Sequence, residues 1–253
     1  MKNNLRKPVI ETTKYNIKAP VEKDIKIVFI SDLHEYCISP ILAQVKKAVP
    51  DIVLLGGDII HSTTQSKNGI AFLEQVSKIS PTFCSIGNHE RIFDGDIYSL
   101  FVNCGVVPLD NAAVQYRDIN IGGLSSPLSK KYFEEETDSD KQEKIPDLIW
   151  LDEFNRISGY KILMCHQPEF FDKYIRHFDI DLILSGHAHG GQWRIGNQGI
   201  FAPGQGFFPK YTAGMHEDRL IISRGIGNAY LIPRINNKPE IIFLTLSAIS
   251  KMQ

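Results

Sequence analysis

The chain has 253 residues, of which 43% are hydrophobic and 23% are charged, a balance that is ordinary for a globular protein. Its formal net charge of −1 provides no global basic field for a nucleic acid or an anionic lipid surface. No apolar stretch approaches the roughly 20 residues that a membrane-spanning helix needs, so we expect no integral membrane segment.

Residues 1–20 are expected to form an N-terminal extension. They carry a few positive charges but no following apolar segment of the kind found in signal peptides. The four cysteines are scattered without a C-x-x-C pair, which is typical of reduced thiols rather than of a disulfide framework. These features predict a cytoplasmic location. Because no internal repeat or low-complexity linker is present, residues 1–253 are expected to form a single domain.

Five short apolar runs recur along the chain, and each ends in a polar cluster. In chain order they are "IKIVFISDLH" (ending at His34), "DIVLLGGD" (51–58), "TFCSIGNHE" (82–90), "YKILMCHQP" (160–168) and "DLILSGHAH" (181–189). Continuous apolar runs are typical of strands covered on both faces. Helix-like segments lie between the first three runs, at 40–49 and 69–79. This alternation predicts an α/β fold with right-handed crossovers.

The last quarter of the chain has a different character. The runs "LIISRGIG" and "EIIFLTLSAI" predict two more strands, and their Gly, Pro and Asn-rich connections favour a more antiparallel arrangement. Upstream, residues 129–147 carry mixed charges without a hydrophobic period. Two interpretations of this stretch remain open, a solvated loop or exposed helix and a lid near the site.

Potential metal ligands stand at the end of each of the five runs. They are Asp32 and His34, then Asp58, then Asn88 with His89, then His166, then His187 with His189. In an open α/β sheet the carboxyl ends of the strands converge on a crevice, which is where ligands bind. A mixture of oxygen and imidazole donors suits divalent Mn, Fe, Zn or Ni.

The spacing of these residues favours two ions rather than one. In extended backbone, residues i and i+2 point the same way, so Asp32 with His34, and His187 with His189, are expected to face one crevice. Two metal ions in a hydrolase lie about 3.5–4 Å apart, and one histidine of the 187/189 pair is expected to reach each ion. Gly186, Gly190 and Gly191 leave room for a tight turn beside the ions.

The series "SDLH", "GGD", "GNHE", "CHQPE" and "GHAHGGQ" resembles the calcineurin-like metallophosphoesterases, whose signature is D-x-H, G-D, G-N-H-(D/E), H and G-H-x-H in that order. The resemblance covers a core of about residues 25–246. It implies a four-layer α/β/β/α sandwich of two mixed sheets, with a dinuclear metal site at the C-terminal ends of the strands. Each motif alone is weak, but five in the right order form a specific signal.

The family pattern implies a role for each matching residue. It places one metal ion on Asp32, His34 and His189, and the other on Asn88, His166 and His187. Asp58 bridges both ions. His89 lies over the substrate phosphate as the transition-state stabiliser or general acid. No ligand position of the family is missing from the chain.

The sequence after the last motif is similar to a bacterial phosphoesterase subgroup with a G-H-x-H-G-G-Q motif. Several members of that subgroup carry a membrane anchor or export signal, whereas we expect none in this chain, which argues against an envelope location. The sequence "SDLHEY" also departs from the more usual small or apolar residues after D-x-H, so the substrate side of that loop is expected to differ.

The predicted activity is hydrolysis of a phosphodiester, in preference to a monoester, by attack of a metal-bridging hydroxide. The expected partner is a small-molecule phosphoester, because the near-neutral charge argues against a long nucleic-acid duplex. Two alternatives remain: a catalytically silent metal-binding scaffold of the same fold, and a single-metal hydrolase. The sequence leaves open the native metal, the physiological ester and the oligomeric state.

Some basic residues lie outside the motifs. Arg224 and Arg91 are candidates for binding the substrate phosphate, and Arg234 is a weaker one. His61, His177 and His216 are interpreted as surface or structural residues, although His61 follows Asp58 closely enough to face the substrate.

Overall fold

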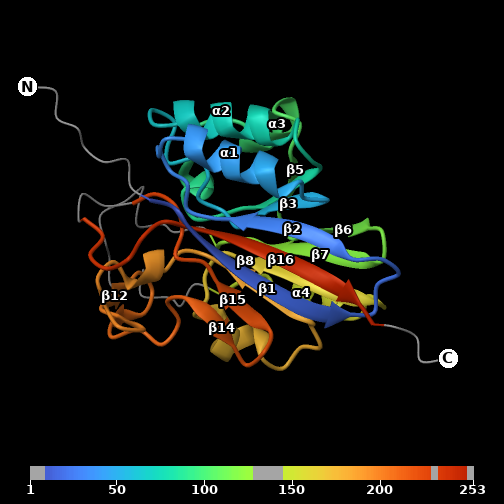
Figure 1. Ribbon diagram of the computed structural model, residues 1–253. Helices are drawn as coiled ribbons and strands as arrows, with labels where there is room; N and C mark the ends of the chain where they lie inside the picture. Colours follow the sequence, from blue (N-terminus) through green and yellow to red (C-terminus); the bar gives the residue numbers. More distant parts are fainter. Residues whose placement is uncertain (1–8, 128–144, 229–232, 250–253) are drawn as a thin grey trace, which may run out of the picture.

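The fold is a stack of four layers in the computed structural model, which describes residues 9–127, 145–228 and 233–249 (Figure 1). Two six-stranded sheets lie face to face, and helices cover the outer face of each. The four-layer α/β/β/α sandwich implied by the resemblance is confirmed. Of the charged stretch 129–147, residues 129–144 lie outside the described residues. Neither interpretation of that stretch, as a solvated loop or exposed helix or as a lid, is therefore tested.

The first sheet combines a parallel core with one antiparallel strand. Across the sheet, its strands are β1 (Glu11–Ala19), β16 (Glu240–Ala248), β2 (Ile25–Ile30), β3 (Ile52–Leu55), β4 (Thr82–Ser85) and β5 (Val107–Leu109). Strands β2 to β5 pair in parallel, whereas β16 runs antiparallel to β2 and parallel to β1. The parallel part requires crossover helices, and these follow the predicted alternation.

Three helices cover the outer face of this sheet: α1 (Ser39–Ala48), α2 (Lys67–Val76) and α3 (Ile97–Asn103). Their apolar sides bury Ile41, Phe72 and Phe101 against strand residues such as Val28 and Ile30. Burying one such side chain stabilises a fold by about 1.5–3 kcal/mol, so this layer anchors the loops that follow β2, β3 and β4.

The second sheet also mixes parallel and antiparallel pairs. Across it lie β14 (Gly214–His216), β15 (Leu220–Ile222), β9 (Leu182–Ser185), β8 (Tyr160–Cys165), β7 (Ile119–Leu124) and β6 (Ala112–Tyr116). Strands β15, β9, β8 and β7 are parallel, while β14 and β6 are antiparallel edges. The expected antiparallel finish is therefore found in part: β15 runs antiparallel to β14 but parallel to β9, and β16 runs antiparallel to β2 but parallel to β1.

Helix α4 (Leu148–Asn155) and the short π-helix η4 (Phe171–Ile175) cover the outer face of the second sheet. Between the two sheets lies a shared apolar layer, in which Phe29 and Leu54 of the first sheet meet Met164 and Leu184 of the second. Because the central strands of each sheet are covered on both faces, β2, β3, β4, β8 and β9 are almost continuously apolar, as the five runs indicated.

Smaller elements complete the described chain. They are η1 (Glu90–Ile92), η5 (His189–Gly191), β10 (Arg194–Ile195), β11 (Gln198–Gly199), β12 (Phe201–Ala202) and β13 (Gly206–Phe207). Within the described ranges, no helix has both the length and the apolar character needed to cross a bilayer.

The N-terminal boundary differs from the expected one. Residues 11–19, assigned above to an extension outside the core, form β1 and pair along their whole length with β16. Every second side chain of β1 is exposed, as in an edge strand with one wet face.

Candidate metal centre

All the predicted ligands stand in loops that leave the carboxyl ends of strands. Strands β2, β3 and β4 of the first sheet and β8 and β9 of the second supply them, so the site lies where the two sheets' loops meet. One expectation was wrong in detail, because the ligands are not in extended backbone. The strands end at Ile30 and Ser185, before the ligand pairs begin.

Left-handed backbone brings these ligands together instead. Positive φ values occur at Asp32 (51°), His34 (49°), Asp58 (54°), His187 (64°) and His189 (45°). Such conformations are uncommon for residues other than glycine and persist where the surrounding structure determines them. The backbone therefore turns sharply just past each of these strands and directs the ligand side chains inward.

The first ligand group consists of Asp32, His34 and His189, whose ligand atoms all lie within 4.8 Å of one another. All three side chains are buried. His189 Nε2 lies 3.6 Å from Asp32 Oδ1, a spacing that leaves the carboxylate and imidazole facing each other without a hydrogen bond. The group has the oxygen and nitrogen donors that a borderline divalent ion binds.

The second ligand group consists of Asp58, His166 and His187, again within 4.8 Å. His166 Nε2 lies 3.2 Å from Asp58 Oδ2 and 4.0 Å from Asp32 Oδ1, so it faces the carboxylates of both groups. His166 Nδ1 lies 2.7 Å from the carbonyl oxygen of Gly56, to which it donates when it carries the proton. This contact leaves Nε2 free to act as a ligand.

Among the residues that the structure describes, three buried polar atoms at the site form no hydrogen bond: His34 Nε2, Asn88 Oδ1 and His166 Nε2, which has only its ion-pair contact with Asp58. Leaving such a group unsatisfied costs about 1–3 kcal/mol each, so native proteins rarely keep several together. Each of the three is an atom that a cation could bind. The residues present therefore fit a site for metal ions.

Burial and charge set the protonation of the imidazoles. Burial lowers the pKa of His34, His187 and His189, which keeps their lone pairs available. Burial also acts to lower the pKa of His166, but the charge of Asp58 outweighs it and raises that pKa to about 10. Conversely, burial acts to raise the pKa of Asp58, and the charge of His166 holds it well below its ordinary value.

The buried carboxylate of Glu90 fixes the backbone around Asp58. Its Oε1 accepts hydrogen bonds from the N–H groups of Ile59 (2.7 Å) and Ile60 (3.0 Å), and its Oε2 from those of Asp58 (2.8 Å) and Gly87 (3.0 Å). Burial raises the pKa of Glu90, and the nearby charge of Asp58 adds to the shift. In the sequence, Glu90 stands out only as the last residue of the "GNHE" motif, and nothing there indicates its hydrogen bonds to the loop of Asp58.

The loop that carries Asn88 and His89 is positioned by its contacts with Asp58. The His89 backbone N–H donates to Asp58 Oδ1 at 2.9 Å, and a Cβ on Gly87 would lie only 2.3 Å from that same oxygen. Gly87 is therefore required by close approach to the ligand. The His89 ring lies near the second group, with Nε2 3.9 Å from Asp58 Oδ2.

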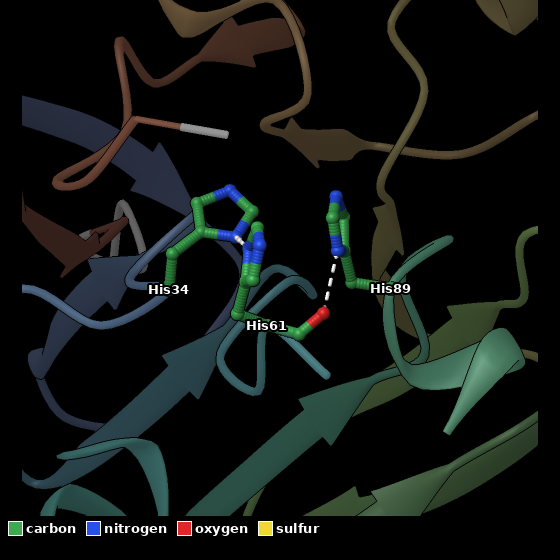
Figure 2. Close-up of side chains that lie close together, drawn as sticks. All are labelled: His34, His61 and His89. Atoms are coloured by element: carbon green, nitrogen blue, oxygen red, sulfur yellow. Dashed lines mark hydrogen bonds between the residues drawn. The ribbon is translucent and has the colours of Figure 1, made fainter. Parts of the chain in front are cut away.

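His61, which no motif contains, lies in the same cluster. Its Nδ1 is 2.9 Å from His34 Nδ1, and its carbonyl oxygen lies 2.7 Å from His89 Nδ1 (Figure 2). The only sequence signal was its position three residues after Asp58. The other two histidines outside the motifs are elsewhere: His177 is exposed, and His216 on β14 contacts the carbonyl of Ala213.

The two arginines predicted to bind phosphate are held by carboxylates instead. Arg224 pairs with Glu11 (2.9 Å) and Glu240 (3.0 Å), and Arg91 makes a two-pronged contact with Asp110. These contacts take up both guanidinium groups, so the structure gives no support to a phosphate-binding role for either.

Arg234 is the arginine that lies against the cluster. Its Nη2 is 3.3 Å from His189 Nδ1 and also donates to the carbonyl of Gly227. Burial lowers its pKa to about 10, which still leaves it charged at neutral pH. Its sequence context, "IPRINN", contained no signal that could have ranked it above the other arginines.

Comparison with known proteins gives a consistent result. The sequence model of the family described as calcineurin-like phosphoesterase matches residues 25–191. The uncharacterized protein YpbG of Bacillus subtilis is 28% identical over 252 residues, covering 96% of this chain and 88% of that protein. The phosphodiesterase YaeI of Escherichia coli is 29% identical over 246 residues, covering 87% and 82% respectively. The uncharacterized metallophosphoesterase YkuE of Bacillus subtilis is 28% identical over 260 residues, covering 95% and 86%.

Proposed function

From the premise that the chain belongs to the calcineurin-like phosphoesterase family, we propose that it is a phosphodiesterase that uses two divalent metal ions. The observation that carries the proposal is the pair of ligand groups that meet at His166, whose Nε2 faces both Asp58 and Asp32, with a buried ligand atom that forms no hydrogen bond in each group of the described chain. The proposed unit is a single domain that acts on a small-molecule phosphoester.

The residues that would hold the ions divide as the family pattern implies. Asp32, His34 and His189 would hold one ion, Asn88, His166 and His187 the other, and Asp58 both. When bound, divalent ions of the Mn, Fe, Zn or Ni type lower the pKa of coordinated water and neutralise charge on phosphoryl oxygens. Asp58 suits the shared position because it belongs to the second group and its charge also acts on the pKa of His34 in the first group.

His89 is the proposed general acid. A neutral His89 whose Nδ1–H donates to the carbonyl of His61 presents Nε2 on the opposite side of the ring. When protonated, Nε2–H can donate to the leaving-group oxygen or to the phosphoryl group. Arg234 stands behind His189 and adds fixed positive charge to a site whose carboxylates are buried.

Preference for a diester rests on a single relative. YaeI carries the name phosphodiesterase and is 29% identical to this chain, whereas YpbG and YkuE are uncharacterized. The net charge of −1 favours a small substrate over a long nucleic-acid duplex.

The experiment that tests the proposal begins with metal-stripped protein. Mn²⁺, Fe²⁺, Ni²⁺ and Zn²⁺ are added back singly, and hydrolysis of bis(p-nitrophenyl) phosphate is compared with that of p-nitrophenyl phosphate. We expect metal-dependent turnover that is faster for the diester. His89→Ala should lower kcat for the diester by about 10²–10⁴-fold while two ions stay bound.

The other outcomes are informative. Faster turnover of the monoester would contradict the diester assignment but not the phosphoesterase. Two bound ions without turnover of either ester would favour the catalytically silent scaffold. His177→Asn, an exposed change outside the motifs, serves as the control that should retain full activity.

A further inference from the structure

Three histidines from three successive loops of the first sheet face one another (Figure 2). His34 follows β2, His61 follows β3 and His89 follows β4. The His61 and His89 rings are nearly parallel, with centroids 4.6 Å apart and 26° between their planes, and His34 stands edge-on to both. His34 and His89 have parts in the proposed function, whereas the family pattern gives His61 none.

The hydrogen bond between His34 and His61 determines which nitrogen of each ring carries a proton. His34 Nε2 is buried, forms no hydrogen bond with any residue in the described ranges and is the atom available to an ion, so its lone pair must be free. A neutral His34 then carries its proton on Nδ1, which lies 2.9 Å from His61 Nδ1. His61 Nδ1 is therefore the acceptor, and a neutral imidazole that accepts at Nδ1 carries its proton on Nε2.

His89 has the opposite arrangement. Its Nδ1 donates to the carbonyl oxygen of His61, so a neutral His89 has a lone pair at Nε2. The stacked pair thus offers one donor, His61 Nε2–H, and one acceptor, His89 Nε2. In the described part of the chain, His61 Nε2 forms no hydrogen bond, and the His61 side chain is only partly buried.

We propose that His61 contacts the substrate, donating a hydrogen bond from Nε2–H to a substrate oxygen next to His89, with its orientation fixed by His34. The proposal rests on the proposed phosphoesterase function. His61 is then a second imidazole at the site, beside His89. Its Nε2–H can donate a hydrogen bond while the ring is neutral, whereas His89 must be protonated to donate from Nε2.

Two substitutions separate the two nitrogens of His61. In His61→Asn the side-chain amide can occupy the position of Nδ1 and keep a partner for His34, but it has no group at the position of Nε2. In His61→Gln the amide nitrogen can reach the position of Nε2 and donate there. His177→Asn is the matched control on the surface.

With bis(p-nitrophenyl) phosphate, we expect His61→Asn to retain two ions per chain and to lose about 10²-fold in kcat/KM, as for the loss of one fixed transition-state donor. His61→Gln should recover to within about tenfold of the parent protein. The same comparison with a diester that has a poorer leaving group, such as diphenyl phosphate, shows which substrate oxygen His61 contacts. A larger loss for that diester places the hydrogen bond on the leaving group, and an equal loss places it on a phosphoryl oxygen.

A second readout does not depend on activity. In ¹⁵N-histidine-labelled protein loaded with Zn²⁺, long-range ¹H–¹⁵N correlation identifies the protonated nitrogen of each neutral ring, and the His61→Asn spectrum assigns the His61 signals. We expect proton on Nε2 of His61 and on Nδ1 of His34. The opposite tautomer at His61 would overturn the inference.

Three other results would also overturn it: full activity in His61→Asn, equal losses in His61→Asn and His61→Gln, or a loss of activity explained by loss of bound metal. A third ion that disappears in His61→Asn would mean that the three histidines bind metal rather than substrate. Failure of the proposed function is distinguishable, because the parent protein would then hydrolyse no phosphoester with any metal while the tautomers remained measurable.

Discussion

At the residue scale, the site depends on backbone conformations that the residues do not favour. Five of the proposed ligands have positive φ, and a non-glycine residue in such a conformation costs of order 1 kcal/mol or more. Neighbouring contacts have to hold these conformations. Among them, the carboxylate of Glu90 accepts four backbone N–H groups and determines the path of the chain through Asp58.

Glu90→Gln should therefore destabilise the metal-free protein by about 2–3 kcal/mol. The glutamine keeps one carbonyl oxygen but replaces the other oxygen with an NH₂ group that faces N–H donors. Denaturant unfolding followed by fluorescence measures the change. Glu74→Gln, an exposed change on α2, is the control that should stay within about 0.5 kcal/mol of the parent. Equal stability of the two variants would contradict the role assigned to Glu90.

The sequence predicted residue identity at the site better than residue conformation. The ordered motifs placed Asp32, His34, Asp58 and His166 in one crevice, and the structure brings them together. We expected extended backbone at the same motifs, but the strands end at Ile30 and Ser185, before the ligand pairs begin. The apolar pattern of a strand does not predict the backbone conformation of the loop that follows it. Arg234 could be predicted only as the weaker of three candidates, since its contact with His189 joins segments 45 residues apart without a shared motif.

At the element scale, the edge strand β1 is held to β16 by more than backbone pairing. Arg224 bonds both Glu11 at the start of β1 and Glu240 at the start of β16, and Glu240 is almost fully buried. Burial acts to lower the pKa of Arg224, but the hydrogen bond that Arg224 donates to Glu240 outweighs it and raises that pKa. β1 was not expected from the sequence, although "KYNIKA" alternates the inward Tyr15, Ile17 and Ala19 with exposed polar residues; the pattern is short, and pairing with β16 selects the strand.

We predict that Arg224→Gln lowers the free energy of unfolding by about 3 kcal/mol, because it leaves the buried Glu240 carboxylate without its charged partner. Activity at saturating metal should stay within about twofold of the parent in both kcat and KM. Denaturant unfolding and steady-state kinetics measure the two effects. A raised KM with unchanged stability would instead make Arg224 a phosphate ligand.

A second contact between elements predicts a pH dependence. Asp172 on η4 receives hydrogen bonds from Lys210 (2.7 Å), Tyr211 (2.8 Å) and Arg176, which join η4 to the segment between β13 and β14. Burial acts to raise the pKa of Asp172, but these partners outweigh it and lower the pKa from 3.8 to about 2.

Because the folded-state pKa lies below the unfolded-state value, Asp172 stabilises the fold above about pH 4. That contribution is lost as the pH falls through about 2. The difference in melting temperature between the parent protein and Asp172→Asn should therefore be constant above about pH 4 and shrink between pH 4 and 2. A difference that persists unchanged at pH 2 would show that the carboxylate charge is not its source.

At the scale of the whole molecule, the site exists because two sheets meet. The first sheet brings Asp32, His34, Asp58 and Asn88, and the second brings His166, His187 and His189, so neither sheet holds a complete set for either ion. The apolar layer between the sheets is what aligns their carboxyl ends. Periodicity predicted strands and crossovers, but the division into two sheets came only from the family resemblance, because strand order depends on pairings that a local pattern does not contain.

The most direct test of the two-ion phosphodiesterase is a titration. Metal-stripped protein at known concentration is titrated with the ion that restores the most activity, and the initial rate of bis(p-nitrophenyl) phosphate hydrolysis is measured at each step. We predict a rate that rises until two equivalents per chain have been added and then stays constant. A rate that saturates at one equivalent, or diester hydrolysis that is independent of metal, would contradict it.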